Sequence, residues 1–475
     1  MVANSNLLSP VESEVITESQ MVPEMVITPT TPAKFTKEEI RTSLKASTCD
    51  GIFAAIFSSI TGGVLLSNLL LQLGATPTQI GMLSSVPMVV NLLQPLGAYL
   101  SGFTTSRQRY GFWVFGISRS LWLILAIAIA FPKVNNTINY NLVQLTLVIV
   151  FASNLLGAFG SASWLSWMAK LVPEKLRGRY FGIRNSAASF VTLIGVPLIS
   201  IIISAWPGGM LQGYSLLIFL AVICGSISLI CQKFMADVNP KVELITVAES
   251  LEEKDNQSLI SNFQSLISHN FFRFLLYFGF WAFAINISNP FFNLYLLDNL
   301  NINVTWVTVY NSLSAGANLL MLVFWGRLAD KIGNRPLLIL LGVVAALIPL
   351  LWLGTGYNPL CLWVGLPLLH LFSGGVWAAI DLCSNNIQMS IAPRHNQATY
   401  FAIASAVAGI CGAFGATVGG FLAEQPIFGG LPGLFALTSG LRLLALLPLV
   451  LVWEQRSHSL RAMLQSWRMQ SKVVG

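Results

Sequence analysis

The chain has 475 residues, of which 55% are hydrophobic and only 9% are charged, and its mean hydropathy is +0.70. In soluble globular proteins roughly a quarter of all residues are charged, because the surface faces water. This composition therefore excludes a soluble enzyme and predicts a chain buried in lipid. The net charge of +7 does not indicate a nucleic-acid partner, because Lys and Arg lie in short loops between apolar runs and not on one polar domain.

The N-terminal segment is predicted to lie outside the membrane. Residues 1–33 are rich in Ser, Thr, Pro and Glu and contain no Lys or Arg. They therefore lack the basic start of a signal peptide and are predicted to form a disordered tail. Thr36 and Glu39 have the spacing of a capping box, which predicts a short amphipathic helix leading into the first span.

Long apolar runs follow, each of them near or above the ~20 residues that a helix needs to cross a bilayer. Strands of a membrane barrel would give short alternating segments, whereas these runs are continuous. The predicted fold class is therefore an all-α membrane protein with twelve transmembrane helices. The runs are 50–73, 78–102, 110–131, 142–170, 180–204, 212–235, 271–298, 305–329, 336–354, 360–391, 398–423 and 433–453.

One long polar internal segment, 236–268, divides the runs into six and six. With the N-terminus in the cytoplasm, all Lys and Arg residues except Lys133, Arg119 and Arg442 fall on the cytoplasmic side or at its boundary, as the positive-inside rule requires. The predicted order is a cytoplasmic tail and short helix over 1–45, a six-helix bundle over 46–235, a cytoplasmic loop over 236–268, a second six-helix bundle over 269–455 and a cytoplasmic tail over 456–475.

The two halves share a sequence pattern. Pro173 is followed by a Tyr-Phe pair at 180–181. Pro393 is followed by the same pair, at the same spacing, at 400–401. Duplicated six-helix halves are how many secondary transporters build a central site that opens to alternate sides, so the repeat indicates a transporter.

The loop after the eighth run carries the most specific motif. It reads Gly326-Arg327-Leu328-Ala329-Asp330-Lys331-Ile332-Gly333-Asn334-Arg335-Pro336. This resembles the G-x-L-A-D-x-x-G-x-[RK] loop of the major facilitator superfamily, and the runs, central loop and repeat extend the resemblance over about 45–455. The resemblance implies two pseudo-symmetric six-helix bundles, and it places Gly326, Asp330, Gly333 and Arg335 at a cytoplasmic gate.

Physical reasons support these gating roles. Gly326 would permit close approach of two helices, and the Asp330 carboxylate would accept hydrogen bonds at the positive N-terminus of span eleven. Gly333 would permit the tight turn. In the first half, Ser101 stands where the Asp is expected, so a charge-based latch is expected only in the second half.

In this family the first, fourth, seventh and tenth spans line a central cavity, and in each of them polar residues recur on one helical face. Asp50 and Asp381 are predicted to act in coupling or gating. The predicted substrate-binding residues are Asn68, Trp164, Trp281, Asn286, Asn289, Asn293, Trp377, Asp381 and Gln388.

Each candidate has a structural alternative. Asp381 is the most specific, because an ionisable group inside a span is by default a functional hypothesis; its alternative is a structural pair with a neighbouring helix. Asp50 either acts in gating or proton transfer or caps a helix. For His370 a structural role is slightly favoured. Arg119 and Arg442 lie in spans that the family places at the periphery, so structural pairing is favoured for both. The Asn side chains bind hydroxyl groups or hold helices together.

Amides, indoles and one central carboxylate match the hydroxyl groups and apolar ring faces of a neutral sugar or glycoside. The predicted function is therefore secondary active transport of such a solute by proton symport and alternating access. A drug or metabolite efflux antiporter is an alternative, although Gly195-Val196-Pro197 lacks the Gly-Pro pair of many family antiporters. A second alternative is a transporter-like receptor or lipid scramblase without ion coupling.

The remaining predictions are largely negative. The sequence has no G-x-x-x-x-G-K-[ST] loop, so ATP-driven pumping by this chain alone is not expected. It has no H-E-x-x-H or G-x-S-x-G motif, so hydrolysis and an enzyme are not expected either. The six cysteines have no metal-ligand spacing, so no cofactor is predicted. The expected partners are a small-molecule substrate, a coupling proton and the lipid bilayer, and the expected form is a functional monomer in the cell (cytoplasmic) membrane.

Overall fold

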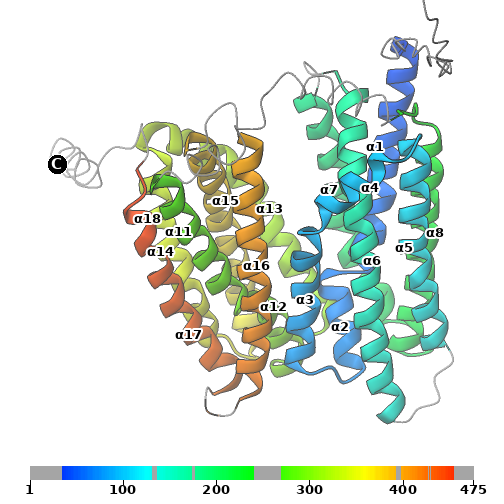
Figure 1. Ribbon diagram of the computed structural model, residues 1–475. Coiled ribbons are helices and arrows are strands. Elements are labelled where there is room, and N and C mark those ends of the chain that lie inside the picture. The colour runs from blue at the N-terminus through cyan, green and yellow to red at the C-terminus, as the bar shows by residue number, and fades with distance from the viewer. Residues whose placement is uncertain are drawn as a thin grey trace, which may run out of the picture. The chain divides into compact units, whose positions relative to one another are not determined.

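The computed structural model describes residues 35–130, 136–173, 177–239, 269–391, 397–425, 427 and 429–453. The predicted N-terminal tail, the C-terminal tail over 456–475 and nearly all of the central loop lie outside these residues. Helices dominate the described chain, and no strand occurs in it (Figure 1).

The helices of the first half run from α1 to α8. They are α1 (Lys37–Ile60), α2 (Gly63–Gln72), α3 (Pro77–Asn91), α4 (Gln94–Gly102), α5 (Arg107–Ala130), α6 (Asn136–Leu171), α7 (Arg177–Ser204) and α8 (Met210–Lys233). Those of the second half are α11 (His269–Asn286), α12 (Asn289–Leu294), the π-helix η2 (Tyr295–Asn299), α13 (Val304–Ile332), α14 (Asn334–Leu353), the π-helix η3 (Cys361–Gly365), α15 (Leu366–Ile391), α16 (Gln397–Glu424), α17 (Gly430–Ala445) and α18 (Leu447–Val450).

Within the described residues, 11 helical segments are long and apolar enough to cross a membrane, and the bent pair α3–α4 brings the number to 12. The prediction of an all-α membrane protein is confirmed. Many large apolar side chains are exposed on these helices, among them Trp113 at 67% and Leu320 at 80%. Such exposure would be unfavourable in water and suits a surface covered by lipid.

The start of α1 follows the predicted capping box. The backbone N–H of Glu39 donates to Thr36 Oγ1 over 3.2 Å, and the backbone N–H of Thr36 donates to Glu39 Oε2 over 2.8 Å. The helix that begins here runs on without a break to Ile60. The amphipathic segment predicted to lead into the first span is therefore the N-terminal part of the same helix, because no Gly or Pro lies between Lys37 and Cys49.

Three spans are broken where the sequence weakens the helix. Between α1 and α2, Gly63 has φ +57°, a value that glycine adopts without strain. The axis bends by 47° between α3 and α4, just before Pro95, and α11 ends before Pro290. Proline lacks an N–H donor and its ring disfavours helical geometry in the preceding residue. The first and seventh spans, which occupy equivalent places in the two halves, are therefore both discontinuous.

Helices of each half pack mainly with one another, which gives the two bundles of the predicted fold. In the first bundle α1 packs on α7 and α8, and α5 packs on α6 and α8. In the second, α13 and α14 pack on α15, α14 also packs on α17, and α11 packs on α16. Between the bundles, the main contacts join α3 to α16 and α7 to α13 (Figure 1).

The seam between α3 and α16 is narrow because glycines face it. A Cβ added to Gly81 would lie 2.5 Å from the carbonyl oxygen of Ala416, and one added to Gly420 would lie 2.8 Å from that of Pro77. Close approach of this kind is what small residues permit in membrane helices. The Thr78 backbone N–H also donates to Glu424 Oε1 over 2.9 Å at the end of the seam.

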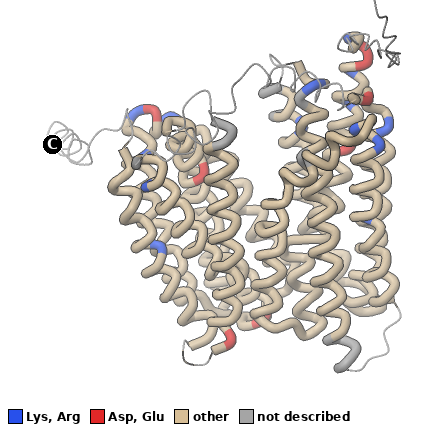
Figure 2. Tube along the Cα trace, viewed as in Figure 1, with Lys and Arg blue, Asp and Glu red and all other residues tan. Residues whose placement is uncertain are grey.

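Hydrogen bonds between the bundles gather toward one end. Ser200 and Thr308 hydroxyls lie 2.9 Å apart, and Ser204 donates to Asn303 Oδ1 over 3.0 Å. At the opposite end, where α1 begins, no hydrogen bond joins the two bundles among the described residues. Figure 2 shows Lys and Arg gathered at that opposite end and rare within the bundles. The predicted topology assigns that end to the cytoplasm, so in this orientation the bundles are joined on the outer side.

Candidate functional site

The candidate site is a cavity of about 580 Å³ whose wall comes from both bundles. The first bundle contributes residues of α1, α2, α3, α5 and α6, and the second contributes α11 and α12. Pockets for small organic molecules have volumes of roughly 300–1,000 Å³. The described polar side chains in the wall are Ser58, Thr61, Ser67, Ser84, Asn91, Ser118, Arg119, Ser153, Asn154, Ser161, Asn286, Asn289 and Asn293.

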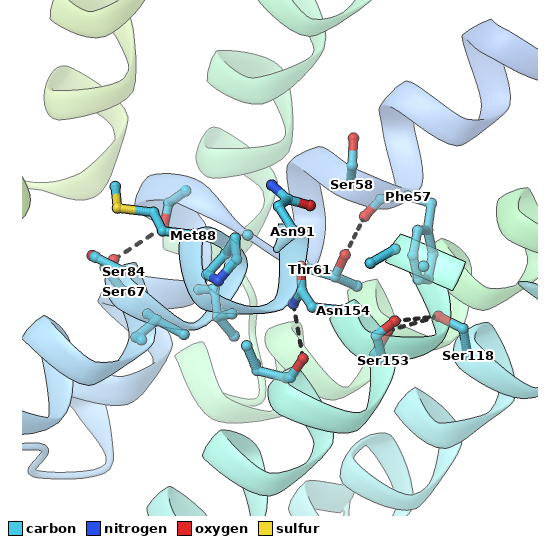
Figure 3. Close-up of a pocket in the computed structure, with 18 of the residues that line it drawn as sticks. Phe57, Ser58, Thr61, Ser67, Ser84, Met88, Asn91, Ser118, Ser153 and Asn154 are labelled. Carbon is cyan, nitrogen blue, oxygen red and sulfur yellow. Dashed lines mark hydrogen bonds between the residues drawn. The ribbon is translucent and has the colours of Figure 1, made fainter. Parts of the chain in front are cut away.

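Figure 3 shows how part of this polar wall is held. The hydroxyls of Ser118 and Ser153 lie 3.0 Å apart, and the indole N–H of Trp122 donates to Ser153 Oγ over 2.9 Å. Asn154 donates to the carbonyl of Val150, one turn earlier on α6, over 2.8 Å (Figure 3). This bond occupies an amide N–H of Asn154 and leaves its amide oxygen as an acceptor.

Arg119 is the charged residue of this wall. Its side chain is 7% exposed, it donates from Nη1 to the carbonyl of Gly225 on α8, and its Cζ lies 5.7 Å from the ring centroids of both Phe57 and Phe115. No carboxylate lies within ion-pair distance of it in the described chain. The resemblance predicts structural pairing at the periphery for this residue, whereas the structure places it on the cavity wall.

Four of the predicted binding residues line a cavity. Asn286, Asn289 and Asn293 line the cavity just described, and Asn286 donates to the carbonyl of Ala282 over 2.8 Å. Asn293 Oδ1 accepts from Asn311 over 3.0 Å. Asn311 belongs to the wall of a second cavity of about 660 Å³ between α7, α13 and α15, which Trp377 also lines.

The other predicted aromatic and amide residues pack between helices. Asn68 is 4% exposed and donates to the hydroxyl of Tyr214 on α8 over 2.7 Å. Trp281 is 3% exposed, with its ring centroid 6.1 Å from that of Tyr277. Trp164 lies under the guanidinium of Arg184, whose Cζ is 4.5 Å from the ring centroid. None of these three lines either cavity.

Two further predicted residues lie on α15. Gln388 is 4% exposed and lines neither cavity. Asp381 is exposed and lies one turn from Trp377 on the same helical face. Because Trp377 lines the second cavity, Asp381 follows it along that face toward the end where no hydrogen bond joins the bundles.

Asp50 is not a helix cap. It lies in the middle of α1 and is 2% exposed, and its Oδ1 accepts from Ser228 Oγ over 2.5 Å and from Gln232 Nε2 over 3.0 Å. Arg184 Nη2 lies 3.7 Å from Asp50 Oδ2. The carboxylate thus joins α1 to α7 and α8 inside the first bundle.

The motif loop lies between α13 and α14. Gly333 has φ +94° at the junction of these helices, which the predicted tight turn requires. Arg335 donates to the carbonyl of Val450 at the end of α18. Asp330 is exposed with no hydrogen bond among the described residues, and a Cβ on Gly326 would meet only the Leu382 side chain at 3.9 Å. The residues just before α16, where the partner of Asp330 is predicted, lie outside the described residues, so the latch stays a prediction.

Arg442 and His370 both form hydrogen bonds inside the second bundle. Arg442 is 1% exposed and donates to the carbonyl of Ala345 and to Ser288 Oγ, over 3.0 Å in each case. Ser288 lies in the break between α11 and α12, so the guanidinium holds the broken span. His370 Nδ1 lies 2.8 Å from the carbonyl of Leu366. Both geometries agree with the structural roles that were favoured.

Sequence reasoning missed the contributions of α3 and α5 to the cavity. Asn91, Ser118 and Arg119 were not predicted as site residues, because the expected lining came only from the first, fourth, seventh and tenth spans. A signal was available for Arg119, since an ionisable residue within a span marks a functional hypothesis. The resemblance points the other way, because it places this span at the periphery.

Two helical bundles around a polar cavity, joined at one end, define a membrane transporter that works by alternating access. The sequence matches the profile described as Major Facilitator Superfamily over residues 51–416, and the chain belongs to this family. No curated protein matches the sequence.

Solved transporters share the fold at low sequence identity. The D-xylose-proton symporter superposes with a TM-score of 0.62 at 16% identity, over 89% of this chain and 100% of the other. The inward-open xylose transporter XylE from E. coli gives 0.60 at 17% identity, over 89% and 98%. The nucleoside transporter NupG gives 0.61 at 12% identity, over 87% and 98%.

Proposed function

We propose that this transporter moves a hydroxylated solute of the sugar or glycoside class, in symport with protons. The observation that carries the proposal is the cavity wall, in which hydroxyl and amide side chains from both bundles surround a volume suited to a small molecule. Amides and hydroxyls both donate and accept hydrogen bonds, as sugar hydroxyls do. The structurally similar transporters are named for xylose and for nucleosides, and these compounds are polyhydroxylated.

Asp381 is the proposed proton carrier. It is an ionisable group inside a span, where such groups commonly serve proton relays. It follows Trp377 along α15, so a proton on it would be close to a solute that passes the second cavity. Its exposed side chain is able to exchange protons with water that enters between the bundles.

The test is uptake into proteoliposomes of purified protein, with labelled sugars, nucleosides and amphipathic cations as a panel, each with and without an imposed proton gradient. The proposal expects accumulation of a hydroxylated solute that depends on the gradient. Accumulation of amphipathic cations alone would support the efflux alternative. Absence of gradient-dependent movement of any solute would support the receptor or scramblase alternative and overturn the proposal.

Two asparagine variants sharpen the test. Asn289→Ala removes an amide from the cavity wall and should raise the KM for the solute. Asn68→Ala removes an amide that donates to Tyr214 outside the cavity, so it should lower stability and leave KM unchanged. Equal effects of the two variants on KM would refute the assignment of this cavity as the solute site.

A further inference from the structure

We infer that the transported solute carries an anionic group, a carboxylate or a phosphate, which binds to Arg119 and the N-terminus of α2 in the central cavity. This inference rests on the proposed function and narrows its substrate class from sugars and glycosides in general to acidic sugar derivatives. Three features of the described residues carry it: the free donors of Arg119, the charge balance around the cavity, and the uncapped start of α2.

The first feature is the donor capacity of Arg119. A guanidinium has five N–H donors, and one nitrogen of Arg119 donates to the Gly225 carbonyl. Its Nε and Nη2 have no hydrogen-bond partner among the described residues, and neither atom is fully buried. They therefore reach the cavity that Arg119 lines. A planar pair of donors of this kind suits the two oxygens of a carboxylate or phosphate.

The second feature is a buried positive charge with no carboxylate within ion-pair distance among the described residues. Arg119 is 93% buried, since 7% of it is exposed, and a buried charge is costly unless an opposite charge accompanies it. No described residue of the cavity wall is acidic. The buried carboxylate of the same bundle, Asp50, already accepts from Ser228 and Gln232 and lies 3.7 Å from Arg184. Asp50 therefore attracts Arg119 only from beyond ion-pair distance and shares its charge with Arg184, and the described cavity wall carries positive charge alone.

The third feature is the start of α2, a helix of 10 residues. Gly62 and Gly63 line the same cavity, and no side chain caps this helix. The first N–H groups of a helix lack intrahelical partners and carry partial positive charge. A Cβ on Gly63 would meet nothing within 4 Å, so space remains beside these donors. Discontinuous helices present such ends to anionic substrate groups in other transporters.

The test compares three probes that share one ring: glucose, glucuronate and glucose 6-phosphate. Their binding to the purified full-length protein is measured by isothermal calorimetry at two salt concentrations. At least one of the two anions should bind about tenfold or more tighter than glucose, because a charge-assisted hydrogen bond is stronger than a neutral one. The carboxylate and phosphate arms identify which anion the site prefers.

Two Arg119 variants separate charge from packing. Arg119→Met should remove the preference, so that neither anion binds more than about threefold tighter than glucose to this variant, and Arg119→Lys should retain part of the preference because it keeps the charge. If Arg119→Met does not fold, the ranking of the three probes in the wild-type protein and in Arg119→Lys decides the matter.

The outcomes against the inference are distinct from failure of the proposed function. Glucose that binds as tightly as both anions, or an anion preference that survives in Arg119→Met, would overturn the anionic class while hydroxylated-solute transport stands. Binding of none of the three probes, together with no uptake of any hydroxylated solute in the panel, would overturn both.

Discussion

The glycine seam between α3 and α16 gives a direct test of alternating access. A Cβ on Gly81 would lie 2.5 Å from the Ala416 carbonyl oxygen, whereas an ordinary contact needs about 3.4 Å. The backbones would have to separate by close to 1 Å, and overpacking of this kind costs about 1–3 kcal/mol. The variant Gly81→Ala is therefore expected to disfavour the joined end by about 5- to 150-fold in population.

The assay measures the distance between two spin labels. They are attached to cysteines that replace Thr76 and Gln425, which flank the seam, in a protein whose native cysteines have been replaced. Gly81→Ala should shift the distance distribution at this end toward longer values. Gly316→Ala is the matched control, because its added Cβ would meet nothing within 4 Å. An unchanged distribution in both Gly81→Ala and Gly420→Ala would refute the view that this seam must part during transport.

Three further substitutions test other parts of the molecule. Asp381→Asn should abolish gradient-driven accumulation in proteoliposomes while membrane insertion stays intact; full accumulation would remove Asp381 from the proton pathway. Asp330→Ala should slow turnover without changing solute preference, and unaltered turnover would argue against the latch. Asp50→Ala leaves Ser228 and Gln232 without their acceptor and Arg184 without a carboxylate. It should destabilise the protein by about 3–5 kcal/mol, as measured by thermal unfolding in detergent, and the exposed Asp381→Asn serves as the mild control.

The fold was predictable because lipid leaves few options for the chain. Continuous apolar runs in a chain with 9% charge must be helices, since lipid offers no hydrogen bonds to other backbone conformations. The capping box at Thr36 and Glu39 and the turn at Gly333 were likewise predictable, because each depends on residues close in sequence. The continuity of α1 depends on local sequence as well, since no Gly or Pro lies between Lys37 and Cys49.

The candidate site was only partly predictable. A period of 3.6 residues was assumed to run through the first span, but the break at Gly62 restarts the helix, and Asn68 then faces α8 instead of the cavity. Arg119 was misplaced for another reason: whether a span faces the cavity depends on the packing of distant helices, which a single helical period does not encode. Asn289 and Asn293 did reach the cavity across the break before Pro290.

The Arg442 guanidinium has a consequence for how a solute would be recognised. It fastens the interrupted seventh span to its neighbours through Ser288 and Ala345, so Asn289 and Asn293 are already oriented before any ligand arrives. A binding surface set in advance loses little conformational entropy when it is occupied. The affinity for the solute should then depend mainly on its contacts with these amides, because ordering the protein costs little free energy.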